Sequence, residues 1–190
     1  MSTRDKIVTA AVELFIKQGI SKTTTKEIAA SASVAEGSIY RYFPSKEQLA
    51  WQVFKEYHQY LATQLQLSVA KDNQLKDKIH SLVSCFLKLA DDDWLMFSYY
   101  VTSQHTHMKN VSKGMLTPYQ VIYQIIEEGI EEGEIKTTEK NIFTAMVMGA
   151  VHQIAINKIY LRISGDLYPQ CELVSETIVN MTMIKGSDHE

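Results

Sequence analysis

The segment from residue 23 to residue 46 reads TTTKEIAASASVAEGSIYRYFPSK and decides the fold of the first part of this chain. Its apolar residues have the spacing of two short helices joined by a tight turn of about three residues. Ile28 and Ile39 face inward from the two helices, and Val34 fills the turn between them. The second helix therefore directs short polar and aromatic side chains outward, which is typical of a helix-turn-helix motif.

Helical periodicity continues along the rest of the chain, without a convincing run of two-residue alternation. Capping boxes that begin at Thr24, Ser45 and Thr117 mark three helix starts, because each side-chain oxygen satisfies an otherwise unpaired backbone amide. Gly19 supplies a left-handed stop for the first helix. The sequence predicts an all-α fold of nine helices, at about residues 3–18, 25–31, 35–42, 46–70, 74–90, 92–106, 117–132, 139–163 and 171–184.

The composition is that of a globular protein with a real core. The 190 residues are 45% hydrophobic and 22% charged, and the formal net charge is −3. Residues 1–50 carry seven Lys and Arg against five Asp and Glu, whereas the remainder carries twelve against seventeen. A mildly basic N-terminal part on an acidic body predicts an anionic partner at the N-terminus.

Cysteine usage and hydropathy indicate a soluble protein of a reducing compartment. Two cysteines, Cys85 and Cys171, exclude a disulfide-rich secreted scaffold and a Cys-based zinc site. The N-terminus shows no signal-peptide pattern. The most apolar stretch, residues 142–156, is interrupted by polar side chains and is expected to be too short and too polar to span a bilayer. We therefore expect a cytoplasmic protein with no membrane partner.

Enzyme patterns are missing from the sequence, which has no phosphate loop, dinucleotide fingerprint or nucleophile elbow. His105 and His107 point about 200° apart on a helix, which is not the spacing of metal ligands. The acidic run of residues 91–93 is best explained as the capped start of a helix. We expect a protein with no catalytic residues, no cofactor and no metal site.

The helix-turn-helix segment carries a longer signature: Ile28-Ala29, Ala32-Ser33-Val34-Ala35, Gly37-Ser38-Ile39-Tyr40, Phe43 and Ser45-Lys46. In this it resembles the TetR family of bacterial transcriptional repressors. The resemblance covers about the first 50 residues, and the rest of the chain matches the family only in length and helical character. Two positions depart from the family pattern. Ser33 replaces the turn glycine, and Ala35 replaces the serine that caps the recognition helix, at a cost of about 1 kcal/mol.

The resemblance implies a helix-turn-helix DNA-binding domain over residues 1–46 and an effector-binding and dimerisation domain over residues 47–190. It further implies a homodimeric, ligand-responsive repressor that a small lipophilic or aromatic effector releases from a palindromic double-stranded DNA operator. Ser33, Ala35 and Glu36 leave one alternative open, a helical small-molecule-binding protein that has lost DNA binding.

The expected DNA contacts follow from side-chain chemistry on the exposed side of the motif. Lys46 and the hydroxyls of Tyr40, Tyr42 and Thr25 suit phosphates, a use to which the resemblance also points for the tyrosines. Gly37 lets backbone approach a base edge, where Glu36 has the choice of accepting from a cytosine amino group or repelling wrong sites. The candidate DNA-binding residues are Thr25, Glu36, Gly37, Ser38, Tyr40, Arg41, Tyr42 and Lys46.

Aromatic side chains gather between residues 85 and 123, the region that encloses the effector in the family that this chain resembles. Residues of this kind at helical spacing fit a plain core as well, but polar tips among them need partners when they are buried. We expect a mainly apolar pocket with a few polar anchors. The candidate ligand-binding residues are Phe86, Trp94, Phe97, Tyr100, His105, Tyr119 and Tyr123.

The last two predicted helices are apolar on more than one side. Residues 142–161 carry apolar side chains nearly all round, and Gly149 permits a close approach of another helix. This pattern predicts half of a four-helix dimer interface, and the alternative is a single central core helix. The long fourth helix, through Trp51, Phe54 and Tyr57, is expected to join the DNA-binding motif to the ligand-binding part.

Overall fold

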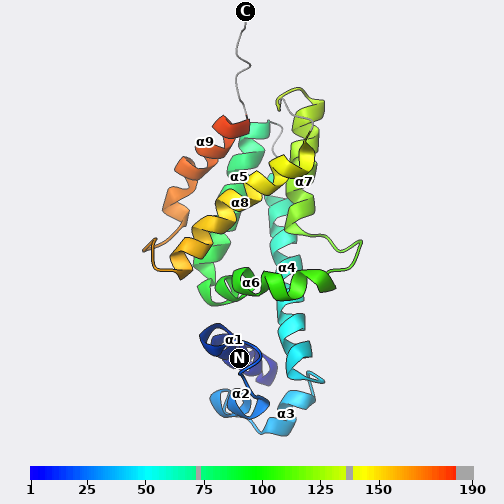
Figure 1. Cartoon of the computed structure of the whole chain (residues 1–190), viewed down its shortest axis with the longest axis vertical. Helices are drawn as coiled ribbons and strands as arrows, with labels where there is room; N and C mark the ends of the chain where they lie inside the picture. The colour runs from blue at the N-terminus through cyan, green and yellow to red at the C-terminus, as the bar shows by residue number, and fades with distance from the viewer. Residues whose placement is uncertain (72–73, 136–138, 183–190) are drawn as a thin grey trace, which may run out of the picture. The chain divides into compact units, whose positions relative to one another are not determined.

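The computed structural model describes residues 1–71, 74–135 and 139–182, and over these residues the fold is all-helical, as predicted. Its elements are α1 (Thr3–Gln18), α2 (Thr25–Ser31), α3 (Glu36–Tyr40), α4 (Lys46–Val69), α5 (Leu75–Asp92), α6 (Trp94–His107), η1 (Met108–Asn110), α7 (Pro118–Glu131), α8 (Lys140–Ile159), η2 (Tyr168–Gln170) and α9 (Cys171–Thr182) (Figure 1). The last two residues predicted for the ninth helix, 183–184, lie outside the described residues.

The predicted helix starts are confirmed by their hydrogen bonds. Thr24 and Thr117 each form a complete capping box, and the Ser45 hydroxyl accepts a hydrogen bond from the Gln48 amide. A further capping box, between Ser2 and Asp5, begins α1 and was missed by the sequence analysis. Gly19 ends α1 with a φ of 84°, in the region that favours glycine.

Helix α3 is shorter than predicted and spans residues 36–40, where the sequence predicted a helix over 35–42. The residue before a proline is disfavoured in the helical region, so Phe43, which precedes Pro44, cannot continue the helix. Ala35 at its N-cap makes no side-chain hydrogen bond, as the sequence suggests. Arg41 and Tyr42 consequently lie in the turn that follows α3.

Helix α8 ends four residues earlier than predicted. Leu161 adopts a φ of 57°, a left-handed conformation that is costly for a side chain with a Cβ. Its amide donates to the Lys158 carbonyl, and the Arg162 amide donates to the Asn157 carbonyl. This pair of bonds is a Schellman motif, which ends the helix without a glycine.

Contacts divide the chain into two compact units, which we call unit 1 (residues 1–58 and 94–113) and unit 2 (residues 59–93 and 114–190). Unit 1 contains α1 to α3, the first half of α4, α6 and η1. Its core is apolar, and α6 packs against α1 within it. The predicted domain boundary at residue 46 divides the chain by function and stays a prediction.

Unit 2 is built on two helix pairs, α5 with α9 and α7 with α8 (Figure 1). Helices α8 and α9 leave apolar side chains uncovered within this unit. Ile142 on α8 is 60% exposed, and Leu173 on α9 is 64% exposed. In the described part of the chain α8 is the one helix that is long and apolar enough to cross a membrane, and 28% of the apolar stretch that meets this criterion is buried. Helix α8 is longer than the stretch of residues 142–156 that was expected to be too short and too polar, and it meets the criterion by length and composition only.

Asp91 holds the connection between α8 and α9 in unit 2. Its carboxylate accepts hydrogen bonds from the backbone amides of Leu167 and Tyr168, at 2.7–2.9 Å, and from the Lys158 ammonium at 3.1 Å. Asp91 thus belongs to the end of α5 and accepts from the amides at the start of η2, and the expectation that the run of residues 91–93 caps the helix after it stays a prediction. Partial burial raises the pKa of Asp91, but these hydrogen bonds outweigh it and the pKa is lowered.

Replacing Asp91→Asn should lower the free energy of unfolding at neutral pH by about 2 kcal/mol, because it removes charge-assisted bonds to two amides and one ammonium. A carboxyl with a lowered folded-state pKa stabilises the fold above its unfolded value of 3.8 and loses this effect as the pH falls through the folded value. Urea unfolding at neutral pH and again below pH 3.8 checks both expectations. An equal difference between the two proteins at both pH values would contradict the assignment.

Candidate functional site

The helix-turn-helix is held by a turn that tolerates a strained serine. Ser33 has a φ of 54°, so the left-handed residue that the family pattern fills with glycine is required here as well. The amides of Ser33 and Val34 donate to the Ala30 and Ala29 carbonyls and close the turn. Ile39 and Phe43 are fully buried beneath α3 and fix it to the rest of unit 1.

The side chains of the predicted DNA-binding residues reach the surface of unit 1 to different extents. Glu36, Gly37, Arg41, Tyr40 and Tyr42 are exposed. Thr25, Ser38 and Lys46 are half-buried. The exposed residues surround α3, as expected of a recognition helix, and their contacts with DNA stay a prediction.

Three of these residues are bonded to one another. The Thr25 hydroxyl donates to the Glu36 carboxylate at 2.6 Å, and the Thr25 oxygen lies 3.2 Å from the Tyr40 hydroxyl. Sequence reasoning placed all three on the surface but not in contact, since Thr25 begins α2 and the other two are the first and last residues of α3. The contact depends on how α2 and α3 cross, which no local pattern encodes.

Lys46 has an internal role in addition to the predicted one. Its ammonium donates to the Thr23 carbonyl at 2.7 Å and lies 3.4 Å from the Ser21 carbonyl, and its side chain is 15% exposed. It therefore ties the start of α4 to the loop between α1 and α2. Two of its three donors are occupied in this way, so a phosphate contact would use the third.

Gly37 is free of contacts that would exclude a side chain. A Cβ added at this residue would meet nothing within 4 Å, and its backbone is not in the left-handed region. The free fold therefore gives no reason for glycine here, although glycine is a poor helix former. A partner that approaches the backbone closely, such as a base edge, would supply the reason.

An aromatic cluster in unit 1 joins α6 to the first half of α4. The Phe54 ring contacts the rings of His58, Tyr100 and His107, with centroids 5.1–5.4 Å apart. The Tyr99 hydroxyl donates to the Ala50 carbonyl at 2.7 Å in the buried interior. Helix α6 is thus fixed directly to the helix that follows the DNA-binding motif.

Two buried histidines belong to this cluster. His58 was not singled out by the sequence, and His107 was considered there only as a metal ligand. His58 Nδ1 lies 3.2 Å from the Tyr100 hydroxyl, and burial lowers the pKa of His58 to about 4. Burial also lowers the pKa of His107, whose Nε2 lies 3.4 Å from the Tyr99 hydroxyl. Both histidines are therefore neutral at pH 7. The spacing of four residues between Phe54 and His58, which places the two rings on one face of a helix, was the sequence signal that could have revealed their contact.

The predicted ligand-binding residues belong to both units. Trp94, Phe97 and Tyr100 contact one another in series in unit 1, whereas His105 is exposed there. Tyr119 and Tyr123 stack on each other in unit 2, where Phe86 is buried. The Tyr119 hydroxyl donates to the Asn141 side chain at 2.6 Å. A role of all seven in ligand binding stays a prediction.

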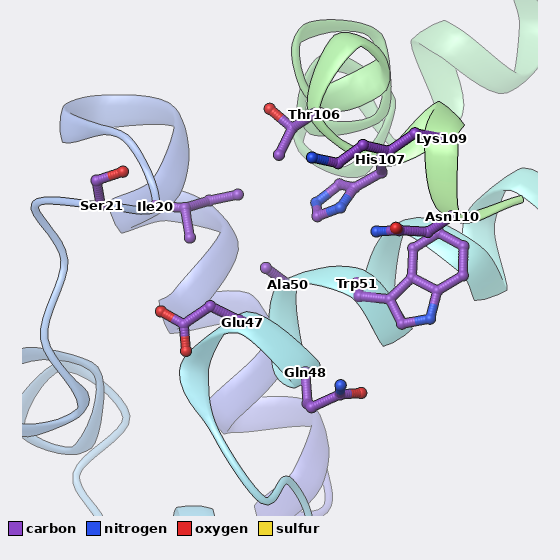
Figure 2. Close-up of a pocket in the computed structure, with 10 residues that line it drawn as sticks. All are labelled: Ile20, Ser21, Glu47, Gln48, Ala50, Trp51, Thr106, His107, Lys109 and Asn110. Carbon is purple, nitrogen blue, oxygen red and sulfur yellow. The ribbon is translucent and has the colours of Figure 1, made fainter.

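A pocket of about 700 Å³ opens within unit 1. Figure 2 shows its walls, which come from the α1–α2 loop, the start of α4 and the end of α6 with η1. His107 and Trp51 lie on it, and their rings are 5.9 Å apart. The described residues contain no group of three or more His, Cys, Asp or Glu side chains placed to hold a metal ion.

Comparison with known proteins identifies the motif. Residues 7–53 match the family model for bacterial regulatory proteins of the tetR family. The fatty acid metabolism regulator protein of Bacillus subtilis is 26% identical over 183 residues, which cover 92% of this chain and 93% of the relative. Residues 7–53 thus form a helix-turn-helix domain of the TetR family.

Solved structures share the fold over nearly the whole length of this chain. The fatty acid degradation regulator FadR of Bacillus halodurans has a TM-score of 0.79 and 21% identity, over 100% of this chain and 98% of that one. FadR of Bacillus subtilis in complex with stearoyl-CoA has a TM-score of 0.74 and 22% identity, over 92% and 97%. The relatives named here are regulators, and at these identities the structures show the fold alone.

Replacing Gly37→Ala should separate stability from DNA binding. The added methyl fits the free protein and should raise the free energy of unfolding by up to about 1 kcal/mol, because alanine is the better helix former. The same methyl should weaken DNA binding about tenfold if the backbone at residue 37 meets a base edge. Urea unfolding and fluorescence anisotropy with labelled duplex DNA measure the two effects, and unchanged DNA affinity would refute the close approach.

Replacing Lys46→Met should lower the free energy of unfolding by about 1 kcal/mol, because it removes the bond to the Thr23 carbonyl but keeps the aliphatic stem. If the third donor also meets a phosphate, the slope of log affinity against log salt should fall by about 0.9 for each subunit that contacts the DNA. The exposed Lys22, replaced in the same way, is the control for loss of one positive charge. A Lys46→Met variant with the wild-type free energy of unfolding and the wild-type salt slope would exclude both the structural role and the phosphate contact.

Proposed function

We propose that this chain is a homodimeric repressor that leaves a palindromic DNA operator when it binds an acyl thioester of coenzyme A. The observation that carries the proposal is the likeness to a fatty acid metabolism regulator over 92% of the chain, together with a helix-turn-helix whose outer residues are exposed. Residues 1–46 would bind DNA, and residues 47–190 would bind the effector and dimerise. The protein would act in the cytoplasm and would not be an enzyme.

The uncovered face of α8 and α9 supports dimerisation. TetR-family regulators bind operator DNA and effectors as dimers. In the single chain Ile142 and Met146 on α8 and Leu173 on α9 are exposed, and apolar faces of this kind mark protein interfaces. A Cβ added at Gly149 on α8 would meet nothing within 4 Å inside the chain. A second copy would cover this face and give the glycine a neighbour.

The effector class is proposed from the relatives. One of them regulates fatty acid metabolism, and the solved FadR of Bacillus subtilis binds stearoyl-CoA. A long acyl chain fits the lipophilic effector that the aromatic residues of this chain predict. The polar tips of Tyr119 and Tyr123 are available candidates for polar anchors in unit 2.

The switch would act through α6. Because α6 is fixed to α1 and to the first half of α4 within unit 1, a shift of α6 moves elements that position the DNA-binding motif. Two recognition helices must match the spacing of half-sites about one helical turn apart. A ligand shifts this equilibrium only by its differential affinity for the two spacings, and each 1.4 kcal/mol changes DNA affinity about tenfold.

A second candidate function, ligand binding without DNA binding, draws on the turn and cap of the motif. Ser33 has the costly left-handed φ of 54°, Ala35 makes no side-chain cap, and Glu36 places a negative charge on the outer face. These features weaken a recognition helix without removing it. Binding of wild-type protein to any duplex from a random library excludes this alternative.

The test begins with selection of an operator from a random duplex library by the wild-type protein. Its affinity should fall at least about tenfold when stearoyl-CoA is present, and operator should weaken stearoyl-CoA binding by the same factor, because coupling is reciprocal. Trp51 fluorescence reports the change, since its ring contacts His107 and Phe54.

Coenzyme A without an acyl chain and free stearate are the matched controls, and neither should release the operator alone. Operator binding that no acyl-CoA chain length alters would contradict the effector class and leave the DNA-binding assignment intact. Light scattering should give a mass of twice 21.6 kDa. A monomer that binds a palindrome tightly would contradict the dimer.

A further inference from the structure

The contact between Thr25, Glu36 and Tyr40 lies on the face that carries the proposed DNA contacts. All three side chains reach solvent, and Tyr40 is 52% exposed. The bonds therefore do not satisfy groups that folding would otherwise bury, and they contribute little to the core. They instead set the state in which the free protein presents this face to DNA.

The protons of the two hydroxyls can be assigned. A carboxylate only accepts hydrogen bonds, so the single proton of the Thr25 hydroxyl points to Glu36, 2.6 Å away. The Thr25 oxygen can then only accept from Tyr40, which makes the Tyr40 hydroxyl the donor over 3.2 Å. The resulting chain runs from Tyr40 to Thr25 to Glu36, and both hydroxyl protons are used within the protein.

A DNA phosphate competes with Glu36 for the Thr25 proton and with the Thr25 oxygen for the Tyr40 proton. A phosphate that accepts from Thr25 must break the charge-assisted bond to Glu36, which is about twice as strong as a neutral one. A phosphate that accepts from Tyr40 breaks only the neutral bond to Thr25. The same phosphate would stand close to the Glu36 carboxylate, and like charges at this range repel. While Glu36 holds its present position, the face is therefore a poor phosphate binder.

A base amino group changes this balance. Glu36 is the first residue of α3, beside Gly37, whose backbone leaves space for a close approach. In the major groove, cytosine N4 and adenine N6 present hydrogen-bond donors that a carboxylate can accept. A carboxylate that turns to such a donor releases the Thr25 proton to a phosphate and moves its own charge away from it.

We propose that Glu36, through its bond to Thr25 and its negative charge near the Tyr40 hydroxyl, makes the phosphate contacts of these two residues conditional on a base amino group opposite α3, and so determines operator specificity. This inference rests on the proposed DNA-binding function. On DNA without that donor the two hydroxyls stay bonded within the protein, and binding is weakened. On the operator the base contact and the phosphate contacts form together.

Two substitutions at Glu36 separate its charge from its hydrogen bond. Glu36→Gln removes the charge but keeps an acceptor for Thr25, whereas Glu36→Ala removes both. On a random-sequence duplex, Glu36→Gln should raise affinity about fivefold through lost repulsion, and Glu36→Ala should raise it about threefold further through release of the hydroxyls. In a Thr25→Val background the two variants should bind equally, because no threonine proton remains to be released.

Selection from a random duplex library reads the specificity. Wild type should select one fixed position per half-site with an amino group, Glu36→Ala should lose the preference there alone, and Glu36→Gln should turn it towards adenine. Glu13→Ala, an exposed charge change on α1, is the control and should alter affinity by less than about twofold at physiological salt.

Two results would overturn the inference and leave the DNA-binding function intact. One is an equal gain in random-duplex affinity for Glu36→Ala and Glu36→Gln when Thr25 is present, and the other is an unchanged selected sequence for both variants. Lower random-duplex affinity of Glu36→Ala would do the same. Failure of the wild-type protein to select any duplex would overturn the proposed function, and this inference with it.

Discussion

The buried hydrogen bond from the Tyr99 hydroxyl to the Ala50 carbonyl fixes α6 on the first half of α4, and the arrangement of unit 1 depends on it. Burial raises the pKa of Tyr99, so the hydroxyl remains a donor at any physiological pH. Around this bond the Phe54, His107 and Tyr100 rings pack together. Helix α6 is distant in sequence from the DNA-binding motif but is part of the same compact body. Packed side chains therefore link α6 to the helix that follows the motif.

The helices of the DNA-binding motif are too short to be stable alone, so the motif depends on a few specific contacts with the rest of the protein. Lys46 ties the start of α4 to the preceding loop, and Arg4 on α1 pairs with Glu56 through two bonds while lying over the Phe43 ring. The strained turn at Ser33 works against these contacts. The motif is consequently placed by long-range bonds and apolar anchors, and intrinsic helix propensity contributes little.

Local signals explain why most of the fold could be predicted. Capping boxes and periodic apolar residues act over three or four residues, so helix starts such as Thr24 and Thr117 are readable from the sequence. The end of α8 was not, because Leu161 in a left-handed conformation has no sequence signal. The exposure of the α3 residues was predicted. The bond from Lys46 to the Thr23 carbonyl and the bond from Thr25 to Glu36 were not predicted, since the first joins residues separated by 23 positions in the sequence and the second joins residues separated by 11. The ligand-binding residues divide between two units that no periodicity separates.

Within the five residues of α3 the buried side chain and the side chains proposed to recognise DNA are different residues. Ile39 is fully buried, while Glu36, Gly37 and Tyr40 face solvent and carry little of the core. Substitutions at the outer positions can therefore accumulate without loss of the fold, since surface changes rarely alter stability by much. Gene duplication followed by drift at these few positions would give two regulators with one scaffold and different target genes. Divergence of the regulatory network is thus mechanically independent of the stability of its protein.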